Sequence, residues 1–183
     1  LPTAPMAAAV TPRPLPAARM ALDDLAFHGP DGGAQTLIKF LTASQTDCFA
    51  VMKDGALVYD WFGGFGALDR QHIVFSITKS MASLLAGVLV GQGRLDPMRA
   101  ITDYLPELAQ SAYQGATLRH LLDMQVASGF TEDYLDTNGI FMAYRQATAW
   151  NPVEEGAETD GLRAFLTRMP ASDGAHGKRH HYC

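Results

Sequence analysis

The sequence has little cysteine: it contains two residues of this type, Cys48 and Cys183, in 183. Two thiols cannot build a disulfide framework or a four-cysteine metal site. A single bridge between them is possible, but nothing in the sequence signals it. His176, His180 and His181 stand near Cys183, yet no second ligand cluster accompanies them. We therefore interpret this histidine-rich stretch as solvent-exposed and expect no metal or organic cofactor.

Positive charge and long hydrophobic runs are also scarce. Lysine and arginine number 14 against 19 acidic residues, for a formal net charge of -5. No basic field exists to hold a nucleic-acid backbone, so we expect no nucleic-acid partner. The longest apolar run, Met81–Gly91, covers about half of the length that a membrane crossing needs. The run is also amphipathic, so we expect no membrane partner.

What is present is the composition of one globular domain, with 48% hydrophobic and 18% charged residues. Residues 1–20 differ from the rest, since they hold five of the ten prolines and only Arg13 and Arg19 as charges. We interpret them as a flexible Pro/Ala-rich leader, with the remnant of a targeting sequence as the alternative. They lack the compact apolar core of a signal peptide, which favours the cytoplasm over a periplasmic or secreted location. Ordered structure is expected from residue 21 to residue 183.

Strand patterns come early in this ordered part. Residues 48–52 and 56–62 are rich in Val, Tyr, Phe and Trp, and Lys53-Asp54-Gly55 separates them. Asp-Gly supplies the positive φ values of a tight turn, so the pattern predicts a β-hairpin. A short helix is expected before it, over residues 35–42, after the Gly32-Gly33 breaker.

Helical patterns dominate the middle of the chain. The strongest covers residues 76–90, where apolar residues recur at three- and four-residue steps and form one face. A helical turn interrupted by Pro106 is expected over 101–108, and a helix begun by a Thr117 cap over 117–124. A last helix, capped by Thr159 or Asp160, is expected to end at Pro170. Residues 127–158 are predicted to be an irregular loop.

The sharpest chemical signal is a Ser-x-x-Lys tetrapeptide, Ser76 to Lys79, which opens the strongest helix. Residues three apart lie on one face of a helical turn. The unpaired N–H groups of a helix start favour an oxyanion and disfavour an ammonium, so they favour a neutral lysine amine. Such an amine can act as general base for the serine. The alternative is a serine N-cap followed by an exposed lysine.

Five blocks extend this signal: Phe75–Ser80, Gly91-x-Gly93-x-Leu95-Asp96-Pro97, Tyr104–Leu108, Thr117-x-x-His120–Met124 and Ser128-Gly129. Their order and spacing resembles the serine β-lactamase-related hydrolases, which include penicillin-binding proteins, class C β-lactamases and carboxylesterases. Ser-x-x-Lys is the nucleophile motif of that superfamily. Phe130–Asp136, followed by Trp150-x-Pro152, is similar to the 6-aminohexanoate-oligomer hydrolase and esterase branch. The resemblance covers about residues 45–183 and implies a mixed α/β (α+β) fold, β-lactamase/transpeptidase-like, with an antiparallel sheet flanked by helices plus a helical region.

The resemblance also implies site residues. Ser76 would be the nucleophile and Lys79 the general base. Tyr182 falls where the family has a tyrosine that relays the proton to the leaving group. Tyr134 matches a loop tyrosine that closes over the substrate. The third family motif, Lys/His-Thr-Gly on a strand that lines the cleft, does not occur in these residues.

The leading hypothesis is therefore a serine hydrolase that forms an acyl-enzyme on a small ester or linear amide. Alternatives are a β-lactamase or DD-peptidase, or a binding or sensor protein on the same scaffold that is acylated slowly or not at all. A plain α/β domain whose serine is only a cap also stays open, as does the oligomeric state. Because the visible strands do not complete a sheet, we expect residues 21–183 to be the N-terminal portion of the hydrolase domain, hydrolytically inactive by itself.

Overall fold

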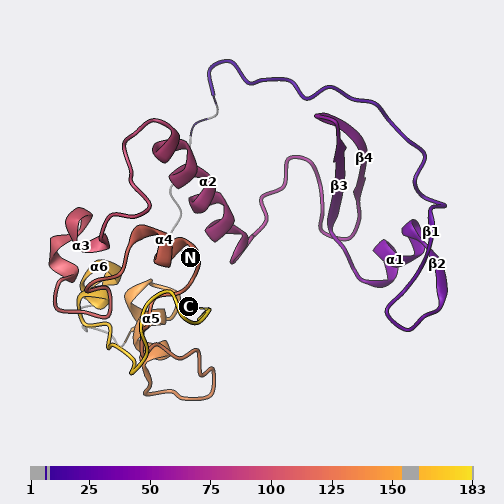
Figure 1. Ribbon diagram of the computed structural model, residues 1–183. Helices are drawn as coiled ribbons and strands as arrows, with labels where there is room; N and C mark the ends of the chain where they lie inside the picture. The colour runs from indigo at the N-terminus through magenta and orange to yellow at the C-terminus, as the bar shows by residue number, and fades with distance from the viewer. Residues whose placement is uncertain (1–6, 8, 154–160, 183) are drawn as a thin grey trace. The chain divides into compact units, whose positions relative to one another are not determined.

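The structure is a computed structural model that describes residues 7, 9–153 and 161–182 (Figure 1). The chain divides into two compact units that meet in sequence between Val74 and Phe75. Each unit has its own cluster of buried apolar side chains.

The first unit contains two small antiparallel sheets and one helix. Its elements are β1 (Ala26–His28), β2 (Ala34–Thr36), α1 (Leu37–Ala43), β3 (Cys48–Lys53) and β4 (Ala56–Phe62). β1 pairs with β2, and β3 pairs with β4. The predicted hairpin is confirmed: Asp54 has a φ of 51° and Gly55 a φ of 78°, as a tight turn requires.

Two features of this unit differ from the sequence prediction. The expected helix over 35–42 begins only at Leu37, because the preceding residues pair with β1 as a strand. The Pro/Ala-rich stretch is also partly paired. Ala18 N–H donates to Leu57 O at 3.0 Å, Met20 N–H donates to Val58 O at 2.8 Å, and the Arg19 guanidinium forms an ion pair with Asp60. Residues 16–20 thus lie along β4.

The core of the first unit is small. Leu37, Leu41 and Tyr59 are its buried members. The Tyr59 hydroxyl donates to Asp23 Oδ1 at 2.6 Å, and this bond to a carboxylate raises the pKa of Tyr59 to about 12. Cys48, at the start of β3, is exposed.

The second unit is helical. Its elements are α2 (Ile77–Gly91), α3 (Ile101–Tyr104), η1 (Pro106–Leu108), α4 (Leu118–Leu122), α5 (Ile140–Ala147) and α6 (Gly161–Thr167). The predicted turn broken at Pro106 and the Thr117 cap of α4 are confirmed. The two residues proposed to cap the last helix lie outside the described part of the chain.

Helix α5 falls inside the stretch that was predicted to be an irregular loop, so that prediction was wrong for these residues. The signal was present as apolar residues at helical steps, Ile140, Phe141, Tyr144 and Ala147. The polar residues around these apolar positions are typical of a loop, so the helix was not predicted. Packing decides the outcome, since these four side chains all join the core of the second unit.

That core is centred on Phe130, which is 4% exposed. The rings of Phe141, Tyr144 and Phe165 approach it edge-on, with centroids 5.7–6.5 Å away. Edge-to-face contacts of this kind add to the stabilisation that burial provides. The cluster joins α5, α6 and the segment after α4.

None of the residues of helix α2 is buried. The predicted apolar face exists, and its side chains are 56–72% exposed: Ile77, Met81, Leu84, Leu85 and Val88. Among the described helices, none is long and apolar enough to cross a membrane.

We predict that Phe130→Ala lowers the free energy of unfolding of the complete protein by about 3–5 kcal/mol, because the truncation leaves a cavity among three aromatic rings. Denaturant unfolding followed by circular dichroism measures it. Leu135→Ala is the matched control, since Leu135 is 91% exposed and its removal should change stability by less than about 0.5 kcal/mol. Equal losses in the two variants would show that the aromatic cluster is not the core of this unit.

Candidate active site

The site is built around the two residues that precede α2, Phe75 and Ser76. Phe75 has a φ of 43°, in the left-handed region that a bulky side chain rarely adopts. Such a conformation costs of order 1–3 kcal/mol and persists only where the surroundings hold it. The Phe75 ring lies 5.7 Å from the Trp150 ring, centroid to centroid. This contact accompanies a sharp turn that brings Ser76 to the beginning of α2.

Ser76 occupies the N-cap position without acting as a cap. Its backbone is helical and its side chain makes no capping hydrogen bond. The hydroxyl instead forms a hydrogen bond with the Tyr182 hydroxyl. The alternative reading of Ser76 as an ordinary helix cap therefore lacks its defining bond.

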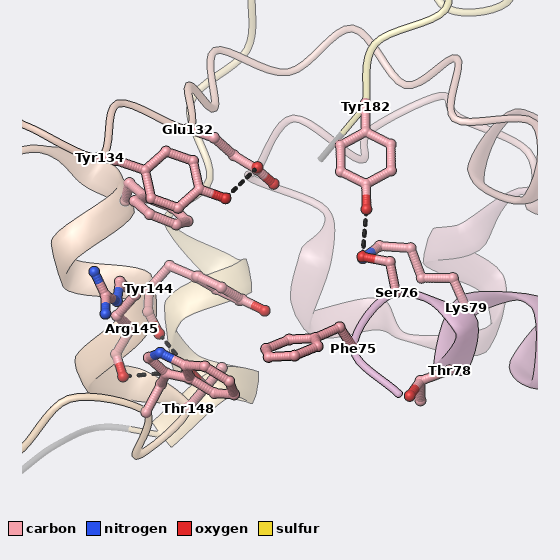
Figure 2. A pocket seen from close by; sticks show the side chains of 12 residues that line it. Phe75, Ser76, Thr78, Lys79, Glu132, Tyr134, Tyr144, Arg145, Thr148 and Tyr182 are labelled. Carbon is pink, nitrogen blue, oxygen red and sulfur yellow. Dashed lines mark hydrogen bonds between the residues drawn. The ribbon is translucent and has the colours of Figure 1, made fainter. Parts of the chain in front are cut away.

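The structure brings Ser76, Lys79 and Tyr182 together (Figure 2). Lys79 Nζ donates to Ser76 Oγ at 3.1 Å and to the Tyr182 hydroxyl oxygen at 3.4 Å. Ser76 and Lys79 come from the first turn of α2, whereas Tyr182 comes from the far end of the chain. The three polar atoms form one hydrogen-bonded group.

This arrangement changes the acidity of Tyr182. The pKa of Tyr182 is lowered, chiefly by the hydrogen bond with Ser76 and then by the bond from Lys79. The Lys79 ammonium also lies 5.0 Å from the centre of the Tyr182 ring. Both contacts favour the phenolate over the neutral phenol. Tyr182 is thus more acidic than a free tyrosine, so its phenolate form is more easily reached.

A pocket of about 750 Å³ opens beside these three residues. Its volume is within the range of small-molecule sites. Five aromatic side chains form much of its wall: Phe75, Tyr134, Phe141, Tyr144 and Trp150. Its polar lining includes Glu132, Arg145 and Thr148. In Figure 2, Tyr134 and Tyr144 lie on the side of the pocket away from Lys79.

Tyr134, the predicted substrate residue, lies at the edge of this pocket and is 68% exposed. Its hydroxyl donates to Glu132 Oε2 at 3.3 Å, and its ring centroid is 4.6 Å from that of Phe141. The nearby Glu132 charge raises the pKa of Tyr134, so the phenol stays neutral and can donate. Tyr134 and Tyr182 therefore differ in acidity although they line one pocket.

Sequence reasoning missed several wall residues. Tyr144, Arg145 and Thr148 belong to α5 or follow it, so they were missed together with that helix. The left-handed Phe75 carried no sequence signal, because aromatic residues do not favour that conformation. Among the residues that the structure describes, no group of three His, Cys, Asp or Glu is placed to hold a metal ion.

Comparison with known proteins shows the family of the chain. A family model described as Beta-lactamase matches residues 22–183. The chain therefore belongs to the beta-lactamase family, within the serine β-lactamase-related superfamily.

Two relatives with the same hydrolase name are similar to this chain. The chain is 32% identical over 162 residues to a 6-aminohexanoate-dimer hydrolase of Paenarthrobacter ureafaciens, covering 88% of this chain and 39% of that protein. A solved structure named "Putative 6-aminohexanoate-dimer hydrolase from Bacillus anthracis" matches with a TM-score of 0.73 and 25% identity, over 93% of this chain and 45% of that one. The chain thus spans less than half the length of either relative, and its β-lactamase/transpeptidase-like fold is incomplete in its sheet.

We predict that Lys79→Ala raises the pKa of Tyr182 toward that of a free tyrosine, because the phenolate loses a hydrogen-bond donor and a nearby positive charge. An NMR titration of tyrosine labelled with ¹³C at Cζ measures it. Lys53→Ala, a change in β3, serves as control and should leave Tyr182 unaffected. A Tyr182 titration identical in wild type and Lys79→Ala would contradict the arrangement.

Proposed function

We propose that the complete protein is a serine hydrolase that cleaves a small ester or linear amide through an acyl-enzyme. The observation that carries the proposal is the hydrogen-bonded group of Ser76, Lys79 and Tyr182 at the edge of an aromatic pocket. Membership of a family whose named relatives are hydrolases supports the reaction class.

In the proposed reaction, Ser76 Oγ attacks the substrate carbonyl carbon and its proton passes to the Lys79 amine. The carbonyl oxygen becomes an oxyanion, and in this proposal the Ser76 N–H at the start of α2 serves as one donor to that charge. Tyr182 then relays the proton to the leaving alcohol or amine as the bond to the carbonyl carbon breaks. Water attacks the resulting ester of Ser76 and releases the acid.

The lowered pKa of Tyr182 supports a second assignment of the base. In that arrangement the Tyr182 phenolate takes the proton from Ser76, and a Lys79 ammonium stabilises the phenolate. The two arrangements differ in whether Lys79 has to lose its own charge. Substitution by arginine distinguishes them, because guanidinium keeps its charge in proteins.

The pocket supports a substrate with an apolar body. Aromatic rings bind alkyl or aryl groups, while Glu132 and Tyr134 offer polar contacts near the edge. The relatives' name refers to the dimer of 6-aminohexanoate, which is a linear amide with an aliphatic chain. A linear amide or ester of this kind is therefore our proposed substrate class, in preference to a β-lactam.

We predict that Ser76→Ala abolishes acyl-enzyme formation, because it removes the attacking oxygen. The measurement is intact-protein mass after incubation with a fluorophosphonate, in wild type and variant of the complete protein. Ser83→Ala, a change on the same helix, is the control and should be labelled at the wild-type rate. Labelling that survives Ser76→Ala would rule out Ser76 as the nucleophile.

Lys79→Arg is expected to lower kcat for a chromogenic ester by about 10²–10⁴-fold, the usual contribution of a general base, with an unchanged fold. Lys53→Arg is the control for the substitution type, and circular dichroism checks the fold. Retention of most activity by Lys79→Arg would exclude Lys79 as the base and favour the Tyr182 phenolate.

A further inference from the structure

Tyr182 lies on a segment, residues 171–182, that has only turns, bends and one isolated bridge. We call it the C-terminal segment. Three backbone bonds hold it to the residues after α4. Ser172 N–H donates to Ala127 O at 3.2 Å, Gly177 N–H donates to Gln125 O at 3.0 Å, and His181 N–H donates to Met124 O at 2.7 Å. Because no helix or sheet fixes this segment, the place of the Tyr182 hydroxyl depends on such contacts.

His176 makes the two side-chain bonds that fix the middle of the segment. The backbone N–H of Ala127 donates to His176 Nδ1 at 3.0 Å, and His176 Nε2 lies 3.0 Å from Gln114 O. A backbone N–H can only donate, so Nδ1 has to be unprotonated, and Nε2 then carries the proton that Gln114 O accepts. Only the neutral imidazole with its proton on Nε2 makes both bonds.

His176 also contacts a second histidine ring. The His120 ring of α4 stacks on it, with centroids 5.9 Å apart, and His120 Nδ1 accepts a bond from Thr117 N–H at 3.2 Å. An added proton on either ring would break a backbone bond and place a charge against its neighbour. The charged residues of α4, Arg119 and Asp123, form an ion pair with each other.

Two cations, Lys178 and Arg179, follow His176 on its own segment. The side-chain contact of His181 does not depend on the charge of its ring. Its Nε2 lies 2.8 Å from Phe130 O, a contact that the neutral and the protonated ring can both make as donors.

We propose that neutral His176 is a positioning residue for Tyr182: it holds the C-terminal segment against the residues around α4, and its protonation releases the segment and withdraws Tyr182 from Ser76 and Lys79. The importance of Tyr182 rests on the proposed function, whereas the attachment of the segment can be tested by itself. Histidine changes charge between pH 5 and 8. The neutral form makes both bonds, so the attachment holds while the ring is neutral and is lost when Nδ1 takes a proton.

Hydrogen exchange of the complete protein, read by mass spectrometry on peptides that cover residues 171–182, tests the attachment. At pH 7.5, His176→Ala should speed exchange there by about tenfold, the effect of losing one to two hydrogen bonds. Wild type should show a similar rise at pH 5 after correction for intrinsic rates. His176→Asn keeps an acceptor near the position of Nδ1 and does not titrate, so its protection should depend less on pH.

His180→Ala is the matched control, because His180 lies in the same segment and its ring makes only a 3.4 Å contact with Asp123 O. Its exchange should follow wild type at both pH values. Exchange that is equal in wild type and His176→Ala, or unchanged in wild type between pH 7.5 and pH 5, would overturn the proposal.

The rate of fluorophosphonate labelling at Ser76 tests the link to Tyr182. His176→Ala should slow labelling at pH 7.5 by about tenfold, and His176→Asn should restore part of the rate and weaken its fall toward pH 5. A loosened segment with an unchanged labelling rate would overturn the positioning role. If wild type is not labelled at any pH, the proposed hydrolase function fails, and the exchange experiment still decides whether His176 holds the segment.

Discussion

The contact on which the site depends is the hydrogen bond between Ser76 and Tyr182. One helical turn is enough to bring Ser76 and Lys79 together, because residues three apart share a face. Tyr182 is far from this pair in sequence, so local helix geometry does not place it beside Ser76 and Lys79. It reaches the pair only because the chain folds back past α4 and stays there, so the site is as stable as that long-range attachment.

The same long-range packing forms the wall of the pocket. Phe141 and Tyr144 pack on Phe130 in the core and also line the pocket, so the core of the second unit extends into the site. Trp150 follows α5 and contacts Phe75, whose left-handed backbone carries the chain into Ser76. Both groups of aromatic rings therefore line the pocket that contains Ser76.

The electrostatics of the site follow from which groups face each tyrosine. Tyr182 shares a hydrogen bond with Ser76 and accepts one from Lys79, and its pKa falls. Tyr134 faces the Glu132 carboxylate, and its pKa rises. Two residues of one type thus acquire opposite tendencies within one pocket: Tyr182 loses its proton more readily, whereas Tyr134 keeps its proton and can donate a hydrogen bond.

The sequence by itself determined the local features. The Asp54-Gly55 turn and the alternating strands of the hairpin were predictable, because tight turns need positive φ values that few residues adopt easily. The apolar period of α2, the Thr117 cap and the break at Pro106 followed from short-range rules as well. Ser76, Lys79, Tyr134 and Tyr182 were found through motifs and family resemblance, without knowledge of their distances.

Only the tertiary structure decided how distant residues act on one another. Helix α5 was hidden, since polar neighbours mask a pattern that becomes clear only when Ile140, Phe141 and Tyr144 pack on a core. The short pairing of β1 with β2 and the strained Phe75 depend on partners that no local pattern reveals. The same holds for His176, whose two backbone bonds join residues 49 and 62 positions apart. Local propensity acts over a few residues, whereas these contacts exist only once the chain has folded.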